Sequence, residues 1–104
     1  MTKYLLVYHG GSMPQTPEEG AKVMKEWNDW IAAMGKSLVD VGAPVGMSKT
    51  VAPDGKISDG GGSNPTMGYS IVEAASIDDA GKLVKTCPQL TAGGTIEIAE
   101  VIQM

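Results

Sequence analysis

The sequence predicts an α+β domain of the ferredoxin-like class, with an antiparallel sheet that carries its helices on one face. Two apolar segments, at residues 3–9 and 67–74, are typical of buried strands. An amphipathic segment at residues 17–34 is typical of a helix. The elements follow the order β-α-β-β-α-β once a small extra hairpin after the second strand is set aside, and two right-handed crossovers then place both helices on one side of the sheet.

The first predicted strand covers residues 3–9. Apolar side chains occupy both of its faces, because residues 4–8 are all Tyr, Leu or Val. A strand that is apolar on both faces is usually central in its sheet. We therefore expect a neighbouring strand on each side of it.

The first helix has a complete start signal. Thr16 can cap it, Pro17 suits its first turn, and Glu19 completes a capping box. Gly35 is suited to end it. Between them, one helical face carries the apolar residues Val23, Trp27, Trp30, Ile31 and Met34.

The rest of the chain supplies the other elements. Ser76 opens a second helix, which Pro88 is expected to stop. Pro53-Asp54-Gly55 has the composition of a tight turn and predicts a hairpin around it. The expected strands are residues 37–41, the hairpin strands 49–52 and 56–58, and residues 67–74 and 95–102.

Helices on one face leave the other face of the sheet to be covered. The segments 4–8 and 67–72 are apolar on both sides, so the second face needs a partner. A second copy of the chain can provide it by packing sheet against sheet. The sequence therefore predicts a homodimer.

Length and composition describe an ordinary globular domain. The 104 residues fit a single domain, residues 1–104, and 42% of them are hydrophobic. No apolar run approaches the roughly 20 residues that span a bilayer, and no secretory signal is recognisable, so we expect no membrane association and a cytoplasmic location. The single cysteine, Cys87, agrees with a reducing compartment. A net charge of −4 with scattered basic residues argues against binding to nucleic acid.

Two residues are candidates for catalysis. His9 is the only histidine and follows a buried strand, where it could exchange protons near neutral pH. The alternative is a histidine held by hydrogen bonds at the strand end or at a dimer contact. Asp40 lies within an apolar strand and would have to be paired or turned toward an opening. The alternative is an edge strand with Asp40 on its solvent side.

Three residues are candidates for ligand binding. Gly10 and Gly11 follow the first strand and can present backbone N–H groups to an anion. Ser70 lies in an apolar strand and could line a cleft. No nucleotide-binding motif is present, and one cysteine with one histidine cannot form a structural zinc site within a monomer. We expect no cofactor and no metal, although a carboxylate-rich site or one shared across a dimer stays open.

The order of elements and several short strings resemble the YCII-related superfamily of small dimeric α+β barrel proteins, including its DGPF branch. Together the strings cover nearly the whole chain. They are residues 3–8, Pro17-Glu18-Glu19, Thr50-Val51, Ser58-Asp59-Gly60, and residues 68–74, 76–80 and 94–98. The resemblance implies a dimeric α+β barrel with a cleft, in a family whose biochemical function is mostly unassigned.

The chain departs from that family at two motifs. Asp59-Gly60 continues with Gly61-Gly62, where the DGPF branch has proline and phenylalanine. The histidine proposed for the YCII branch, half of a His–Asp pair on the first helix, falls near Lys25 here, and that helix has no histidine. The proposed pair therefore does not carry over.

Two functions of different class remain. One is a small-molecule-binding protein with acid–base chemistry in a cleft, to which His9 and Asp40 contribute polar groups. The other is a non-catalytic dimeric module for regulation or interaction. The first predicts a pocket that contains an accessible His9. The second predicts a packed His9 and no pocket of useful size.

Overall fold

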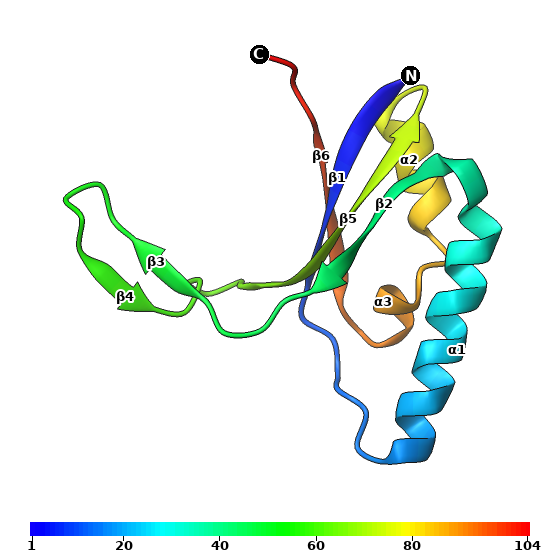
Figure 1. The fold of residues 1–104 in the computed structure, drawn as a ribbon, viewed down its shortest axis with the longest axis horizontal. Helices are drawn as coiled ribbons and strands as arrows, with labels where there is room; N and C mark the ends of the chain where they lie inside the picture. The colour runs from blue at the N-terminus through cyan, green and yellow to red at the C-terminus, as the bar shows by residue number, and fades with distance from the viewer.

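A computed structural model describes all residues from Met1 to Met104. It is an α+β structure with a four-stranded antiparallel sheet, a separate hairpin and three α-helices (Figure 1). In chain order the elements are β1 (Thr2–His9), α1 (Pro17–Met34), a 3-10 turn (Gly35–Ser37), β2 (Leu38–Pro44), β3 (Lys49–Val51), β4 (Ile57–Asp59), β5 (Thr66–Ala74), α2 (Ile77–Val84), α3 (Pro88–Thr91) and β6 (Thr95–Glu100).

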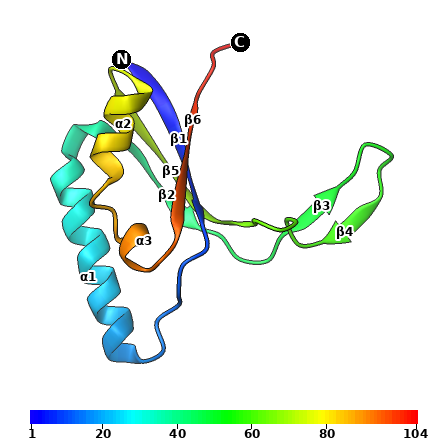
Figure 2. The same ribbon diagram turned by 180° about the vertical axis from the view of Figure 1, so that it is seen from behind.

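The sheet has the strand order β2-β5-β1-β6, which is compatible with the predicted ferredoxin-like fold. β1 pairs with β5 on one side and β6 on the other, so its predicted central position is confirmed. The three helices lie on one side of the sheet, and the hairpin of β3 and β4 projects on the other (Figures 1 and 2). Both termini lie at the end of the sheet away from the start of α1 (Figure 1).

The hydrophobic core fills the space between the sheet and the helices. Leu6 of β1 and Val72 of β5 are completely buried at its centre. Because Leu6 is buried, the alternation along β1 directs Tyr4 and Tyr8 toward the helices and Leu5 and Val7 toward the open face of the sheet. The other core residues are Trp30, Met34, Ala74, Ala80, Val84 and Cys87.

The N-terminus of α1 is the boundary that the sequence predicts best. The Thr16 hydroxyl accepts a hydrogen bond from the Glu19 N–H at 3.1 Å. The Glu19 carboxylate in turn accepts from the backbone N–H of Gln15 at 2.7 Å, one residue before the usual capping-box partner. Such a cap stabilises a helix by about 1 kcal/mol. It fixes where α1 begins, and so fixes one wall of the site described below.

Three predicted boundaries are wrong. α2 ends at Val84, and Pro88 does not stop it but begins the short helix α3, where a proline lacking an N–H is tolerated. Cys87 is buried but precedes α3 instead of lying on the second helix. The last strand ends at Glu100, earlier than predicted, and the second strand continues past Val41 to Pro44.

Candidate functional site

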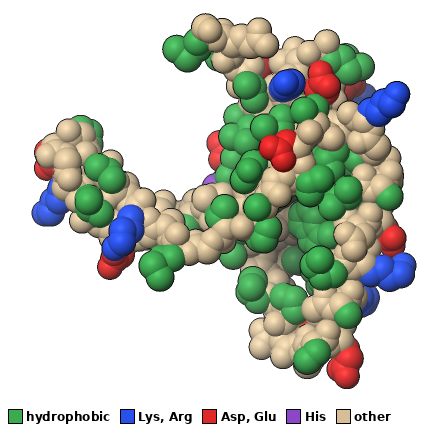
Figure 3. Space-filling model, viewed as in Figure 1, with side chains coloured by type: hydrophobic (Ala, Val, Ile, Leu, Met, Phe, Trp, Pro, Cys, Tyr) green, Lys and Arg blue, Asp and Glu red, His purple; other side chains and the backbone are tan.

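A cavity of about 780 Å³ lies on the helix side of the sheet. It is bounded by α1, by the loop that joins β1 to α1, and by the adjacent ends of β2 and β5. Figure 3 shows the surface hollowed beside α1, with hydrophobic side chains around the hollow. The volume falls within the range of pockets that hold small molecules. Its apolar walls include Met13, Val23, Trp27, Ile31 and Met67.

Two aromatic rings and two hydroxyl groups meet at this cavity. The ring of Tyr8 lies edge-on to that of Trp27, with centroids 5.4 Å apart. The Tyr8 hydroxyl donates to Ser70 Oγ at 2.7 Å, and Ser70 Oγ donates to the Val41 carbonyl at 2.6 Å. Burial raises the pKa of Tyr8 to about 12, despite the opposing effect of its hydrogen bond to Ser70. Tyr8 therefore keeps its proton at neutral pH.

A bulge in β2 brings the Val41 carbonyl to Ser70. The pairing of β2 with β5 shifts register between Asp40 and Ala43, which makes this segment irregular. Gly42 has φ +75°, and a side chain there would overlap the carbonyl oxygen of Tyr69. The Asp40 carboxylate accepts a hydrogen bond from the Gly42 N–H at 2.9 Å and braces the bulge. The positive φ of Gly42, which glycine adopts most easily, thus helps to place the Val41 carbonyl that accepts from Ser70.

Gly10 and Gly11 line the mouth of the cavity, as their prediction as ligand-binding residues requires. Both have positive φ, +68° and +92°, a conformation that favours glycine. The Gln89 side-chain amide holds this segment by donating to the carbonyls of His9 and Gly10, at 2.9 and 3.1 Å. Gln89 itself also lines the cavity.

His9 lies outside this cavity, on the open face of the sheet. Its Nε2 is 3.0 Å from Glu97 Oε1, and its Nδ1 is 3.2 Å from the Pro65 carbonyl oxygen. A carboxylate and a carbonyl only accept, so both ring nitrogens are donors when both bonds form, and the ring is then an imidazolium. The hydrogen bond to Glu97 raises the pKa of His9, although partial burial works against it. In this geometry the ring has no free nitrogen with which to take up a proton.

The structure thus divides the predicted site residues into two groups. Ser70, Gly10 and Gly11 meet at the cavity, whereas His9 and Asp40 are not among its lining residues. Asp40 is exposed on the edge strand β2, as the alternative interpretation expected. Their catalytic roles stay predictions.

Sequence reasoning missed Tyr8, Trp27 and Gln89 as residues of the site. Tyr8 and Trp27 occupy apolar positions of a strand and a helix, and such residues normally belong to the core. Alternation shows that Tyr8 and His9 point to opposite faces of the sheet, but it does not show which of them faces the helices. No signal marked Gln89, whose partners are backbone carbonyls distant in sequence.

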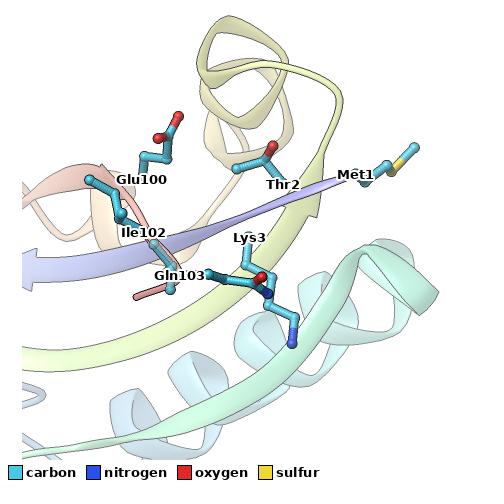
Figure 4. Close-up of a pocket in the computed structure, with 7 residues that line it drawn as sticks. Met1, Thr2, Lys3, Glu100, Ile102 and Gln103 are labelled. Atoms are coloured by element: carbon cyan, nitrogen blue, oxygen red, sulfur yellow. The ribbon is translucent and has the colours of Figure 1, made fainter.

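A second, shallower pocket of about 400 Å³ lies between the start of β1 and the C-terminal residues. Figure 4 shows Thr2 and Glu100 on one side of the β1 ribbon and Lys3 on the other. Its polar groups therefore do not converge on one point. No group of three or more His, Cys, Asp or Glu side chains is arranged to hold a metal ion.

No family model matches the chain, and no curated protein matches it significantly. No helix combines the length and the apolar character that crossing a membrane requires.

Proposed function

We propose that this protein binds a small, mainly apolar molecule in the cavity between α1 and the sheet. The observation that carries the proposal is the combination of a cavity of about 780 Å³ with a buried pair of hydroxyl groups in its wall. Apolar walls supply affinity through burial, and a few fixed polar groups supply orientation. The Tyr8–Trp27 contact presents aromatic surface on which a planar ligand can pack.

The proposal is one of binding and does not assign a reaction. His9 and Asp40, the predicted catalytic residues, do not line the cavity. Tyr8, which does, keeps its proton at neutral pH, because a phenol already titrates well above pH 7 and burial raises the pKa of Tyr8 further, to about 12. The cavity therefore brings together none of the predicted catalytic residues.

The open face of the sheet supports a second proposal, a homodimer that serves as an interaction module. Alternation places four apolar or aromatic residues on this face, two from β1 and two from β5. They lie opposite one another as the cross-strand pairs Leu5–Ile71 and Val7–Tyr69. Tyr69 is 37% exposed, although it is aromatic and central in its strand. A second copy that packed its sheet here would bury this apolar surface.

The strand order, the hairpin and the uncovered face of the sheet support the proposal that the chain belongs to the YCII-related superfamily. The strand order is compatible with a ferredoxin-like β-α-β-β-α-β chain, and the hairpin lies where the sequence predicted it. A dimeric α+β barrel in which the two open faces meet would account for both the uncovered face and the resemblance of the sequence strings. This proposal rests on those strings, since no family model matches the chain.

A fragment screen followed by ¹H–¹⁵N NMR tests the binding proposal. We expect apolar aromatic fragments to shift the Trp27 indole signal and the amide signals of Gly10 and Gly11, which line the cavity. Val23→Trp should fill the cavity and abolish the shifts, because Val23 forms part of its wall. Ala21→Trp, at an exposed position of α1 outside the wall, is the matched control. Fragments that bind the Val23→Trp variant as tightly as the natural protein would refute the proposal.

A further inference from the structure

The direction of the hydrogen bonds at the buried end of the cavity can be derived from its chemistry. A carbonyl oxygen can only accept, so the short contact between Ser70 Oγ and the Val41 oxygen uses the single proton of Ser70. The contact between Tyr8 and Ser70 must then use the proton of Tyr8. The chain therefore runs in one direction, from Tyr8 through Ser70 to Val41.

This direction leaves the buried end with acceptors alone. Both protons are committed, whereas the Tyr8 and Ser70 oxygens each keep an unused lone pair. A ligand group that only accepts would have to break an existing hydrogen bond before it could form a new one. A ligand group that donates would add a bond and break none.

From this asymmetry we infer that the cavity selects ligands whose buried end carries an N–H or O–H donor on an apolar, aromatic-sized body. Indoles, phenols and neutral aromatic amines belong to this class. The inference deepens the proposed binding function and rests on it. The charged lining residues Glu19, Lys22 and Glu26 all lie on α1 and include both signs of charge, so the preference concerns the buried end alone.

Two features of the structure maintain the hydrogen bonds from Tyr8 to Ser70 and from Ser70 to Val41. Ser70 is only 2% exposed, so most of its surface is withdrawn from bulk water. The Gly42 bulge, braced by Asp40, fixes the Val41 carbonyl that takes the proton of Ser70. Asp40 is thus a positioning residue that acts through the backbone of β2.

Indole and benzofuran form a suitable pair of probes, because they share one shape and differ in an N–H donor against an oxygen acceptor. We expect indole to bind about fivefold to tenfold more tightly than benzofuran, the ratio that one net hydrogen bond supplies. The Trp27 indole signal reports binding, because Trp27 lines the cavity. Tyr8→Phe should reduce this ratio by about threefold or more, since one acceptor is lost.

The outcomes separate this inference from the proposed function. Equal binding of the two probes, or tighter binding of benzofuran, would overturn the donor preference and leave a binding cavity in place. No shift of the Trp27 signal with either probe at millimolar concentration would overturn both. Tyr4→Phe removes a hydroxyl from a buried tyrosine of the same strand outside the cavity, and it should keep the full ratio. The comparison in the natural protein decides the inference even if Tyr8→Phe fails to fold.

Discussion

His9 and Glu97 form an ion pair on the open face of the sheet, with Nε2 and Oε1 3.0 Å apart. The side chain of His9 is 10% exposed and that of Glu97 is 63% exposed, so the pair spans the boundary between the sheet and solvent. The pair connects the end of β1 to β6, and the Pro65 carbonyl ties the same ring to the segment before β5. His9 therefore joins three strands at the edge where the hairpin departs.

The His9–Glu97 pair predicts a pH dependence of stability. The pKa of His9 is raised in the folded state above its ordinary value of 6.5. The folded state then binds the proton more tightly than the unfolded state does, so the stabilisation is complete below the unfolded pKa. It is lost as pH rises through the folded pKa of His9. We expect the melting temperature to fall over this interval, as measured by circular dichroism.

Glu97→Gln tests the cause of that dependence, because it removes the carboxylate that makes the largest contribution to the raised pKa. The variant should flatten the fall in melting temperature, and its His9 should titrate nearer 6.5 by NMR. Glu100→Gln removes a carboxylate from the same strand that does not contact His9, and it should keep the slope of the natural protein. An unchanged slope in Glu97→Gln would contradict the assignment.

Gly42→Ala should destabilise the protein more than alanine at a turn glycine that also has positive φ but has open space around it. Positive φ alone costs an alanine about 1–2 kcal/mol, and at Gly42 the new methyl group also meets the Tyr69 backbone. Gly55→Ala is the matched control, because Gly55 also has positive φ but has open space around it. Urea unfolding of both variants measures the difference. Equal losses would show that β2 does not approach β5 as closely as described.

Asp40 gives a prediction that separates bracing from catalysis. Asp40→Asn keeps a side-chain oxygen that can accept from the Gly42 N–H, so stability and indole binding should be nearly unchanged. Asp40→Ala loses that hydrogen bond and should cost about 0.5–1.5 kcal/mol in urea unfolding. A proton acceptor in a reaction would behave differently, since Asn could not replace it. Loss of indole binding or of stability in Asp40→Asn would refute the bracing role.

The sequence predicts the elements well where local signals agree. Thr16, Pro17 and Glu19 locate the start of α1 because capping depends on adjacent residues. Pro88 misleads because proline suits both the position after one helix and the first turn of the next. Because only three residues separate Val84 from Pro88, the sequence fits a proline that follows α2 as well as one that begins α3.

The site is harder to predict because it depends on which face of β1 meets the helices. Both faces of residues 4–8 are apolar, so alternation alone does not tell whether Tyr8 or His9 lines a cleft beside α1. The structure places Tyr8 on that side and His9 on the other. The bulge at Gly42 adds a second long-range effect, because the Tyr69 backbone that requires glycine there lies on another strand.

The uncovered face of the sheet gives the last prediction, a dimer that one charge can disrupt. Ile71 lies beside Leu5 in the middle of this face. In a dimer that packs sheet against sheet, Ile71→Lys would bury a charged ammonium group, whose desolvation costs several kcal/mol. We expect the natural protein to be a dimer at micromolar concentration and Ile71→Lys to be a monomer, as measured by size-exclusion chromatography with light scattering. Ile77→Lys, on α2 and 49% exposed, is the matched control and should stay dimeric. A monomeric natural protein, or a dimer that survives Ile71→Lys, would show that another surface or no surface mediates association.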